Sequence, residues 1–420
     1  LTIYAFKKQA KKIFANRRSD SFVVVKLDIK DFKLINRIYS FKVGNEVINN
    51  MAEALRFVLD DGQSIFARVD VDTFVLLLPY YGRDDLDKKR QKFINSFRKL
   101  MHKGFSSKVV FPTGQYLLKA SDFPYPDMND IFEKVNFAHR AAKQRGDTII
   151  DYDDDIERLA MLEKTVEDRM ESAILEEEFT LYLQPKVLLK DESICGAEAL
   201  VRWKVGDAFY MYPSDFIPIL EKNGFVIQVD KYMLLCTVRY LRKRMQEGSK
   251  LLPISVNFSR HHLSNTNFVK ELCEIVDSVG VPRQYIEIEL TESAFLGNIN
   301  TLIPLIDEIH AAGFLISMDD FGSGYSCFAQ LKDLKVDILK LDREFFSDSK
   351  NQVRAHIVTS GILKIAQELN ITTIAEGVEQ RDQVIMLKEL GCDIVQGYFY
   401  AKPMPTNEFD KFKIENKISE

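Results

Sequence analysis

The second half of the chain holds seven short apolar runs, and each carries a carboxylate, amide or ammonium group at or near its C-terminal end. Short apolar runs are typical of the buried parallel strands of an α/β barrel, and the C-terminal ends of such strands open into one shared mouth. We therefore expect the polar side chains of all seven runs to converge in space. They are Glu198, Asn257, Glu289, the pair Asp319 and Asp320, Lys340, Glu376 and Gln396.

Carboxylates dominate this set, and they would repel one another unless cations lay among them. Oxygen ligands of this kind suit Mg²⁺, Mn²⁺ or Ca²⁺ better than zinc. The pattern therefore predicts a metal-dependent hydrolase that acts on an anionic substrate. An isolated Asp-Asp or Lys-Leu-Asp is usually a solvated turn, so the prediction depends on the joint occurrence of these groups at seven strand ends.

The order of the motifs along the chain resembles that of the EAL family, from about residue 165 to residue 405. The matching segments are Glu198-Ala199-Leu200 with Arg202, Asn257, Glu289-Leu290-Thr291-Glu292, Asp319-Asp320-Phe321-Gly322, Lys340-Leu341-Asp342, Glu376-Gly377-Val378-Glu379 and Gln396-Gly397-Tyr398. EAL enzymes are cyclic di-GMP phosphodiesterases. The resemblance implies a TIM-like (β/α)8 barrel over residues 179–410, hydrolysis of cyclic di-GMP to linear pGpG, and a homodimer formed through the barrels.

The resemblance also implies a role for each site residue. A two-metal site for Mg²⁺ or Mn²⁺ would be formed by Glu198, Asn257, Glu289, Asp319, Asp320 and Glu376. Asp319 would bridge the two ions. Lys340 and Glu376 would orient or activate the attacking water. Substrate and ordered water would be held by Gln184, Arg202 and Gln396.

One further glutamate of the motifs is expected to act through a loop. The segment from Asp320 to Ser326 contains two glycines and can reorganise at low cost. In the family this loop links the metal site to the dimer interface. Glu292 stands where the family has the glutamate that anchors the loop, although it could instead cap the helix that follows.

Residues 19–152 alternate strand and helix signals and predict an α/β sandwich with a mostly antiparallel sheet. The segment from Asp28 to Lys33, followed by Asn36, is similar to the opening metal and nucleotide motif of GGDEF domains. Those domains make cyclic di-GMP from two GTP molecules. The signature itself falls at Asp70-Val71-Asp72-Thr73-Phe74, where both glycines and the glutamate are replaced.

These replacements predict a degenerate domain without cyclase activity that regulates the barrel. Val71 is β-branched, in a hairpin turn where glycine lets the backbone approach a phosphate. Asn45 stands where the family has an aspartate that reads guanine, and Asp147 adds a negative charge near the phosphates. Asp28 and Asp72 could still hold a cation, so weak GTP binding stays open.

The segments that flank this domain are predicted to be helical. Residues 1–18 have apolar side chains at helical spacing, which indicates either a connector from an absent input domain or a helix that packs on its own domain. Residues 153–178 form a charged helix with one apolar side, which we interpret as a linker that ends by packing on the barrel. His261 and His262 follow a strand, and we interpret them as surface residues at a helix start.

The composition adds few constraints. The net charge is −5 and the pI about 5.9, which gives no electrostatic case for binding duplex nucleic acid. Five scattered cysteines without a CxxC pair predict reduced thiols in a cytoplasmic protein. No apolar run approaches the ~20 residues of a membrane helix. The chain starts at Leu1, so we expect a fragment whose parent carries an upstream membrane or sensor segment.

Two other functions stay open at this stage, and a third is excluded by the motif order. The barrel could be a receptor that binds cyclic di-GMP without cleaving it, although such receptors usually lack several metal ligands and this chain has them all. The phosphodiesterase could be activated by GTP at the first domain. A metal-dependent lyase on the same barrel is compatible with the fold but not with the motif order.

Overall fold

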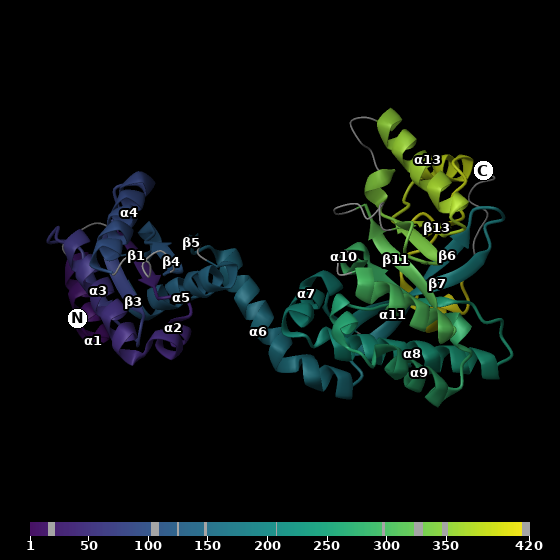
Figure 1. The fold of residues 1–420 in the computed structure, drawn as a ribbon, viewed down its shortest axis with the longest axis horizontal. Helices are drawn as coiled ribbons and strands as arrows, with labels where there is room; N and C mark the ends of the chain where they lie inside the picture. The colour runs from purple at the N-terminus through teal and green to yellow at the C-terminus, as the bar shows by residue number, and fades with distance from the viewer. Residues whose placement is uncertain are drawn as a thin grey trace. The chain divides into compact units, whose positions relative to one another are not determined.

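The computed structural model describes residues 1–15, 22–101, 109–123, 126–146, 149–206, 208–295, 299–322, 331–346 and 352–413. The chain divides into two compact units, residues 1–164 and 165–420. The predicted fold class is confirmed, because a mixed α/β unit precedes a closed barrel of eight strands (Figure 1). Within the ranges given, no helix has both the length and the apolar character that a membrane span requires.

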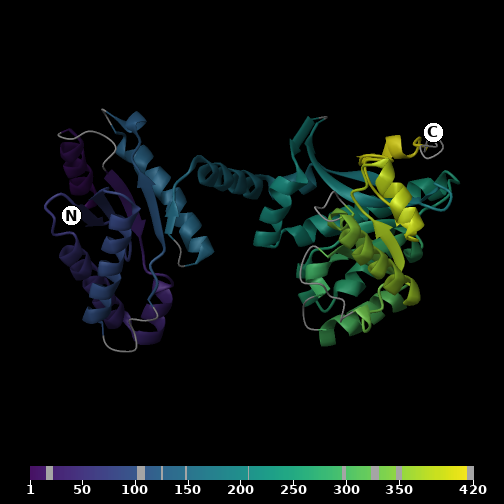
Figure 2. The same cartoon turned by 90° about the horizontal axis from the view of Figure 1, so that it is seen from above.

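The first unit is built on a five-stranded sheet in the spatial order β2 (Ile65–Arg68), β3 (Phe74–Pro79), β1 (Phe22–Leu27), β4 (Thr113–Leu117) and β5 (Ile149–Asp151). Only β4 and β5 run parallel, so the sheet is mostly antiparallel as predicted. Alternate side chains of β1 enter two separate cores, and helices therefore cover both faces of the sheet (Figure 2).

The helices of the first unit divide between these two cores. One face of the sheet packs against α3 (Phe41–Val58) and α4 (Arg83–Leu100), and the short α2 (Phe32–Tyr39) precedes α3. The other face packs against α1 (Ile3–Ala15) and α5 (Met128–Arg145). The apolar side of α1 is buried there through Phe6, Ala10 and Phe14. The first helix thus packs on its own domain, whatever precedes it in a longer protein.

The barrel closes through β6 (Phe179–Leu188), β7 (Ile194–Val205), β9 (Ile254–Asn257), β10 (Ile286–Thr291), β11 (Leu315–Phe321), β12 (Ile338–Leu341), β13 (Thr372–Ala375) and β14 (Ile394–Val395). The sequence predicts parallel strands, but β6 runs antiparallel to both of its neighbours, β7 and β14. The reason lies in the chain length, because five residues join β6 to β7 and a parallel connection needs a dozen or more.

Helices surround the barrel, and two extra strands, β8 (Ala208–Met211) and β15 (Met404–Pro405), extend its sheet. The main helices are α7 (Pro213–Asn223), α8 (Val226–Gln246), α9 (Phe268–Val279), α11 (Ile299–Ala311), α13 (Gln352–Glu368) and α14 (Arg381–Glu389). Helix α6 (Asp154–Leu175) crosses the boundary between the two units. Its second half packs on the barrel, where Val166 and Ala173 are buried beside Trp203.

Candidate metal and catalytic site

A single buried lysine lies at the centre of the barrel mouth. Lys340 comes from β12 and is 1% exposed. Its Nζ lies 2.6 Å from Glu376 Oε1, 3.1 Å from Asp319 Oδ1 and 3.8 Å from Glu198 Oε2, and it also donates a hydrogen bond to Glu289 Oε1. The strand ends that the sequence predicts to converge therefore meet around one ammonium group.

The charges in this cluster do not balance. Burial lowers the pKa of Lys340, but the four carboxylates together raise it by more. Its net pKa therefore lies well above the ordinary value. Burial also raises the pKa of Glu376 well above its ordinary range and that of Glu289 to about 7. One ammonium has three N–H donors, which is too few for four carboxylates. Glu289 Oε2 is buried and accepts no hydrogen bond from any described residue.

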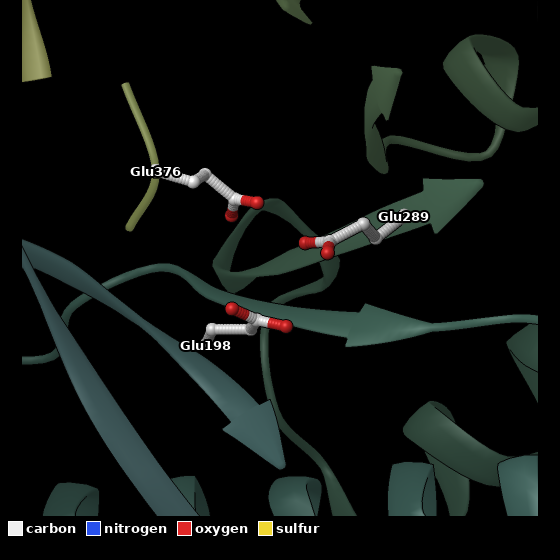
Figure 3. Close-up of side chains that lie close together, drawn as sticks. All are labelled: Glu198, Glu289 and Glu376. Carbon is white, nitrogen blue, oxygen red and sulfur yellow. The ribbon is translucent and has the colours of Figure 1, made fainter. Parts of the chain in front are cut away.

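The carboxylates form two groups that share one member. Oxygen atoms of Glu198, Glu289 and Glu376 lie within 4.8 Å of one another, and so do oxygen atoms of Asp319, Asp320 and Glu376. Figure 3 shows the first group, with Glu289 on a strand and Glu376 on a loop, and the carboxylates turned toward one another. Each group offers the hard oxygen donors that Mg²⁺ and Mn²⁺ prefer, and the unpaired Glu289 oxygen fits a metal ligand.

Neighbouring Asp319 and Asp320 reach the same group because β11 contains a bulge. Consecutive residues of a regular strand point to opposite faces. The pairing of β11 with β12 shifts register between Met318 and Phe321, and Asp320 has a φ of +54°. The end of the strand does not explain the reach of Asp320, because β11 continues to Phe321; the bulge turns the side chain.

Two side-chain amides bind Glu198, and a third amide supports one of them. Asn257 donates to Glu198 Oε1 at 2.9 Å, and Gln396 donates to Glu198 Oε2. Gln396 also donates to Gln184 Oε1 at 3.1 Å, and Gln184 in turn donates to the Ala401 carbonyl at 3.1 Å. Gln184 comes from the reversed strand β6, where it pairs with Glu198 across the ladder. These predicted substrate residues thus form a chain of hydrogen bonds behind a predicted metal ligand.

Arg202 lines a cavity next to the carboxylates. The cavity has a volume of about 740 Å³, and its lining also includes Asn257 and His261. This size lies in the range of small-molecule sites. The guanidinium group lies 5.6 Å from the centre of the Tyr182 ring, and one nitrogen donates to the Val201 carbonyl at 2.8 Å. Arg202 is therefore fixed in the wall of a cavity that Asn257, a hydrogen-bond donor to Glu198, also lines.

Comparison with known proteins identifies the family of the barrel. Residues 167–403, more than half of the chain, match the family described as EAL domain. The chain belongs to the EAL family. Residues 4–148 match the family described as diguanylate cyclase, GGDEF domain. The tandem order of the two domains predicted from the motifs is confirmed.

Individual EAL proteins are similar over nearly the whole chain. Cyclic di-GMP phosphodiesterase NbdA from Pseudomonas aeruginosa is 30% identical over 406 residues, which cover 94% of this chain and 50% of that protein. Signaling protein YkoW from Bacillus subtilis is 29% identical over 396 residues, covering 94% and 49%. The chain thus spans about half the length of these relatives. The solved PaMucR phosphodiesterase in complex with c-di-GMP is 29% identical with a TM-score of 0.55, and the match covers 58% of this chain and 99% of that one.

Glu292 lies at the edge of the EAL site rather than within the carboxylate groups. It is buried at the start of α10 (Glu292–Phe295), and its Oε2 accepts a hydrogen bond from the Gly322 backbone at 2.8 Å. This contact is the one expected of a loop anchor. Residues 323–326, which complete the predicted loop, lie outside the described residues.

The interpretation of His262 as a surface residue is wrong. Its side chain is completely buried, and its Nε2 lies 3.1 Å from Asp230 Oδ2. His262 belongs to the 3-10 helix η4 (Arg260–Ser264) and packs between Phe258 and Phe268. The aromatic residues around the histidine explain its burial, and Asp230 supplies the polar partner that a buried imidazole needs.

The GGDEF-like unit has its own buried carboxylate, Asp28, directly after β1. His139 Nε2 lies 3.2 Å from Asp28 Oδ1, and Lys143 Nζ donates to Asp28 Oδ2 at 2.6 Å. Burial raises the pKa of Asp28, but His139 and Lys143 together lower it by more. The net pKa of Asp28 is therefore below its ordinary value. Burial, and then repulsion from Asp28, raises the pKa of Asp72. Asp147 lies outside the described residues.

The turn that carries the degenerate signature folds without glycine. None of residues 70–73 has a positive φ, and Val71 is 58% exposed. Arg68 Nε donates to the Val71 carbonyl at 2.8 Å and to the Asp70 carbonyl at 3.2 Å. The carbonyl groups of the turn thus accept hydrogen bonds from the arginine side chain.

Sequence reasoning missed two features. His139 lies four residues before Lys143 on α5, and this spacing places both on one helix side, which could have predicted their shared contact with Asp28. Glu287 precedes Glu289 by two residues on β10, so both face into the barrel. There Glu287 binds the buried Lys186 at 2.9 Å, and no sequence pattern links that lysine to it.

Proposed function

We propose that the barrel is a metal-dependent phosphodiesterase that hydrolyses cyclic di-GMP to linear pGpG. The observation that carries this proposal is the excess of buried carboxylates around a single lysine. Four carboxylates contact Lys340, and a fifth, Asp320, joins the group formed by Asp319 and Glu376. Similarity to the cyclic di-GMP phosphodiesterases NbdA from Pseudomonas aeruginosa and PdeR from Escherichia coli supports the choice of substrate.

The metal ligands proposed for Mg²⁺ or Mn²⁺ are Glu198, Asn257, Glu289, Asp319, Asp320 and Glu376. When bound, the cations would supply Lewis-acid activation of water and of the phosphodiester. Lys340 keeps its proton because its pKa is raised, so it acts as a fixed positive charge and as a donor that orients water. Asn257 and Gln396 keep the Glu198 carboxylate in one orientation from both of its oxygen atoms.

The cavity beside Arg202 is the proposed place for part of the nucleotide. A guanidinium group can grip a phosphate with two parallel hydrogen bonds, and its stacking on Tyr182 limits the orientations that it can take. The volume of about 740 Å³ leaves room for a base and its ribose next to the mouth. We assign Arg202 and Gln184 to substrate binding.

Product analysis tests the activity. The purified chain is incubated with cyclic di-GMP and Mg²⁺ or Mn²⁺, and the products are separated by chromatography. We expect linear pGpG, and none after addition of a chelator. Unchanged substrate that still binds to the protein would contradict the enzyme and favour a receptor.

We propose that the GGDEF-like unit makes no cyclic di-GMP. Lys143 already pairs with Asp28 and His139 lies 3.2 Å from it, so this carboxylate has less need for a cation than the carboxylates around Lys340. Both signature glycines are absent, and Arg68 donates a hydrogen bond to the Val71 carbonyl. Both features argue against a phosphate close to Val71. We therefore propose that the GGDEF-like unit regulates the barrel, with or without bound GTP.

We propose that the chain forms a homodimer through the barrels. Helix α13 exposes Val353, Ile357 and Ile365, which are 70%, 62% and 43% exposed and lie on one side of the helix. Gly361 lies on the same side with open space around it, so two copies of the helix could approach closely. Sedimentation analysis should give a dimer for the unmodified chain and more monomer for Ile357→Asp, but not for Lys388→Asp on α14.

A further inference from the structure

A short helix contacts the residues that follow Asp320 and Glu376. These two carboxylates belong to the group that Asp319 completes. This 3-10 helix, η6 (Arg343–Phe345), follows β12 and therefore begins three residues after Lys340. Its start is fixed by Asp342, whose carboxylate accepts a hydrogen bond from the Glu344 backbone at 2.8 Å. The remaining contacts of η6 join it to the residues after Asp320 and after Glu376.

The first contact is between Phe345 and Gly322. A Cβ atom on Gly322 would lie 2.0 Å from Phe345 Cζ, so the ring rests directly on the glycine backbone. The φ of Gly322 is +98°, which L side chains rarely adopt. Phe345 also stacks on Phe321, with ring centres 6.4 Å apart and planes at 17°. Because Phe321 and Gly322 follow Asp320 directly, the phenylalanine ring limits where that carboxylate can lie.

The second contact is between Arg343 and Gly377. A Cβ atom on Gly377 would lie 3.0 Å from Arg343 Cβ and 3.3 Å from its Cδ. Gly377 has a φ of +64° and follows Glu376, the glutamate shared by the two carboxylate groups. One helical turn is therefore packed against the backbone next to two carboxylates of one group.

The third contact ties η6 to helix α13. The hydroxyl of Thr359 is buried and lies 2.9 Å from the Phe345 carbonyl. The same hydroxyl lies 2.9 Å from the Ala355 carbonyl within α13. Thr359 thus links the backbone of Phe345 to the helix whose outer side is exposed and apolar.

We infer that Phe345 and Arg343 are positioning residues that set the separation of Asp320 and Glu376 at the proposed metal site. Neither turn can move toward η6 without displacing it, because each glycine is in direct contact with a side chain of η6. Thr359 fixes η6 in turn, so a shift of α13 changes the distance between the two carboxylates. The inference rests on the proposed function, since it concerns the ligands of the same site.

Mn²⁺ affinity, measured by calorimetry without substrate, tests the inference. Phe345→Ala should weaken Mn²⁺ binding about tenfold, the usual loss when a residue that orients a metal ligand is removed. Phe345→Leu keeps an apolar side chain at this position and adds no atom against Gly322, so it should lose less affinity than Phe345→Ala. Glu344→Ala is the matched control, because this exposed side chain belongs to η6 and contacts neither glycine. It should leave Mn²⁺ affinity unchanged.

A double variant that enlarges residue 322 and shortens residue 345 tests the contact between Gly322 and Phe345 directly. Gly322→Ala alone should weaken Mn²⁺ binding, because its methyl group meets the Phe345 ring. Combining it with Phe345→Ala removes the obstacle and should recover part of the affinity, although the positive φ keeps some cost. Wild-type Mn²⁺ affinity in folded Phe345→Ala, or no recovery in the double variant, would overturn the inference. Absence of Mn²⁺ binding by the unmodified chain would instead overturn the proposed function.

Discussion

Asp28 and Asp319 are both buried carboxylates near the end of a strand, yet their surroundings differ in charge balance. Asp28 pairs with Lys143 at 2.6 Å and lies 3.2 Å from His139. Asp319 shares Lys340 with three glutamates. The difference teaches that an acidic motif alone does not define a metal site, because the number of neighbouring protein cations decides whether a carboxylate still needs a metal ion.

The largest effect is expected from removing one carboxylate of the mouth. Glu198→Ala should reduce cyclic di-GMP hydrolysis by about 10³-fold or more, comparable to the loss of a strong electrostatic group from other active sites. Product formation measured at saturating Mg²⁺ checks this. Asp28→Asn, the matched change in the other unit, should leave hydrolysis close to wild type. Equal losses in the two variants would remove the distinction between the sites.

Two buried lysines among the described residues of the barrel, Lys340 and Lys186, sharpen the comparison. Lys340→Met should lower kcat about 10²-fold while leaving the KM for cyclic di-GMP within a few fold, because the lysine acts on water. Lys186 pairs with the buried Glu287, so Lys186→Met should destabilise the fold by about 3–5 kcal/mol. The folded fraction of Lys186→Met should keep its activity. A near-normal kcat for Lys340→Met would show that Lys340 balances the charge of the carboxylates but does not act on water.

A smaller effect is expected from the GGDEF-like unit. Incubation of Glu198→Ala with GTP and Mg²⁺ should yield no cyclic di-GMP, and the inactive barrel ensures that any product would accumulate. Mass spectrometry of the reaction gives the answer. Accumulated cyclic di-GMP would contradict the interpretation of Val71, Thr73 and Asn45 as replacements that abolish synthesis.

The sequence predicts the convergence at the mouth because strand ends of a barrel share one edge, and this holds for Glu289 and Lys340, whereas Glu198 lies within β7, which continues to Val205. It does not predict the direction of β6, although the five-residue connection to β7 is a usable signal. The bulge at Asp320 and the burial of His262 depend on register and on aromatic neighbours that are distant in sequence. Such features come from tertiary packing, which local periodicity does not contain.

The contacts of η6 illustrate the same limit. Gly322 and Gly377 are visible in the sequence as parts of motifs, but the side chains that press on them come from a third segment. The Glu198 and Lys340 variants test two of the roles assigned at the mouth, and the roles assigned to the other metal ligands, to Arg202 and to Gln184 remain predictions.

The most direct test of the central claim is a Mn²⁺ titration of three proteins: the unmodified chain, Glu198→Ala and Asp28→Asn. If the excess of carboxylates creates the metal site, Asp28→Asn binds Mn²⁺ like the unmodified chain, and Glu198→Ala binds it at least about tenfold more weakly. Loss of Mn²⁺ binding in Asp28→Asn with normal binding in Glu198→Ala would contradict the account.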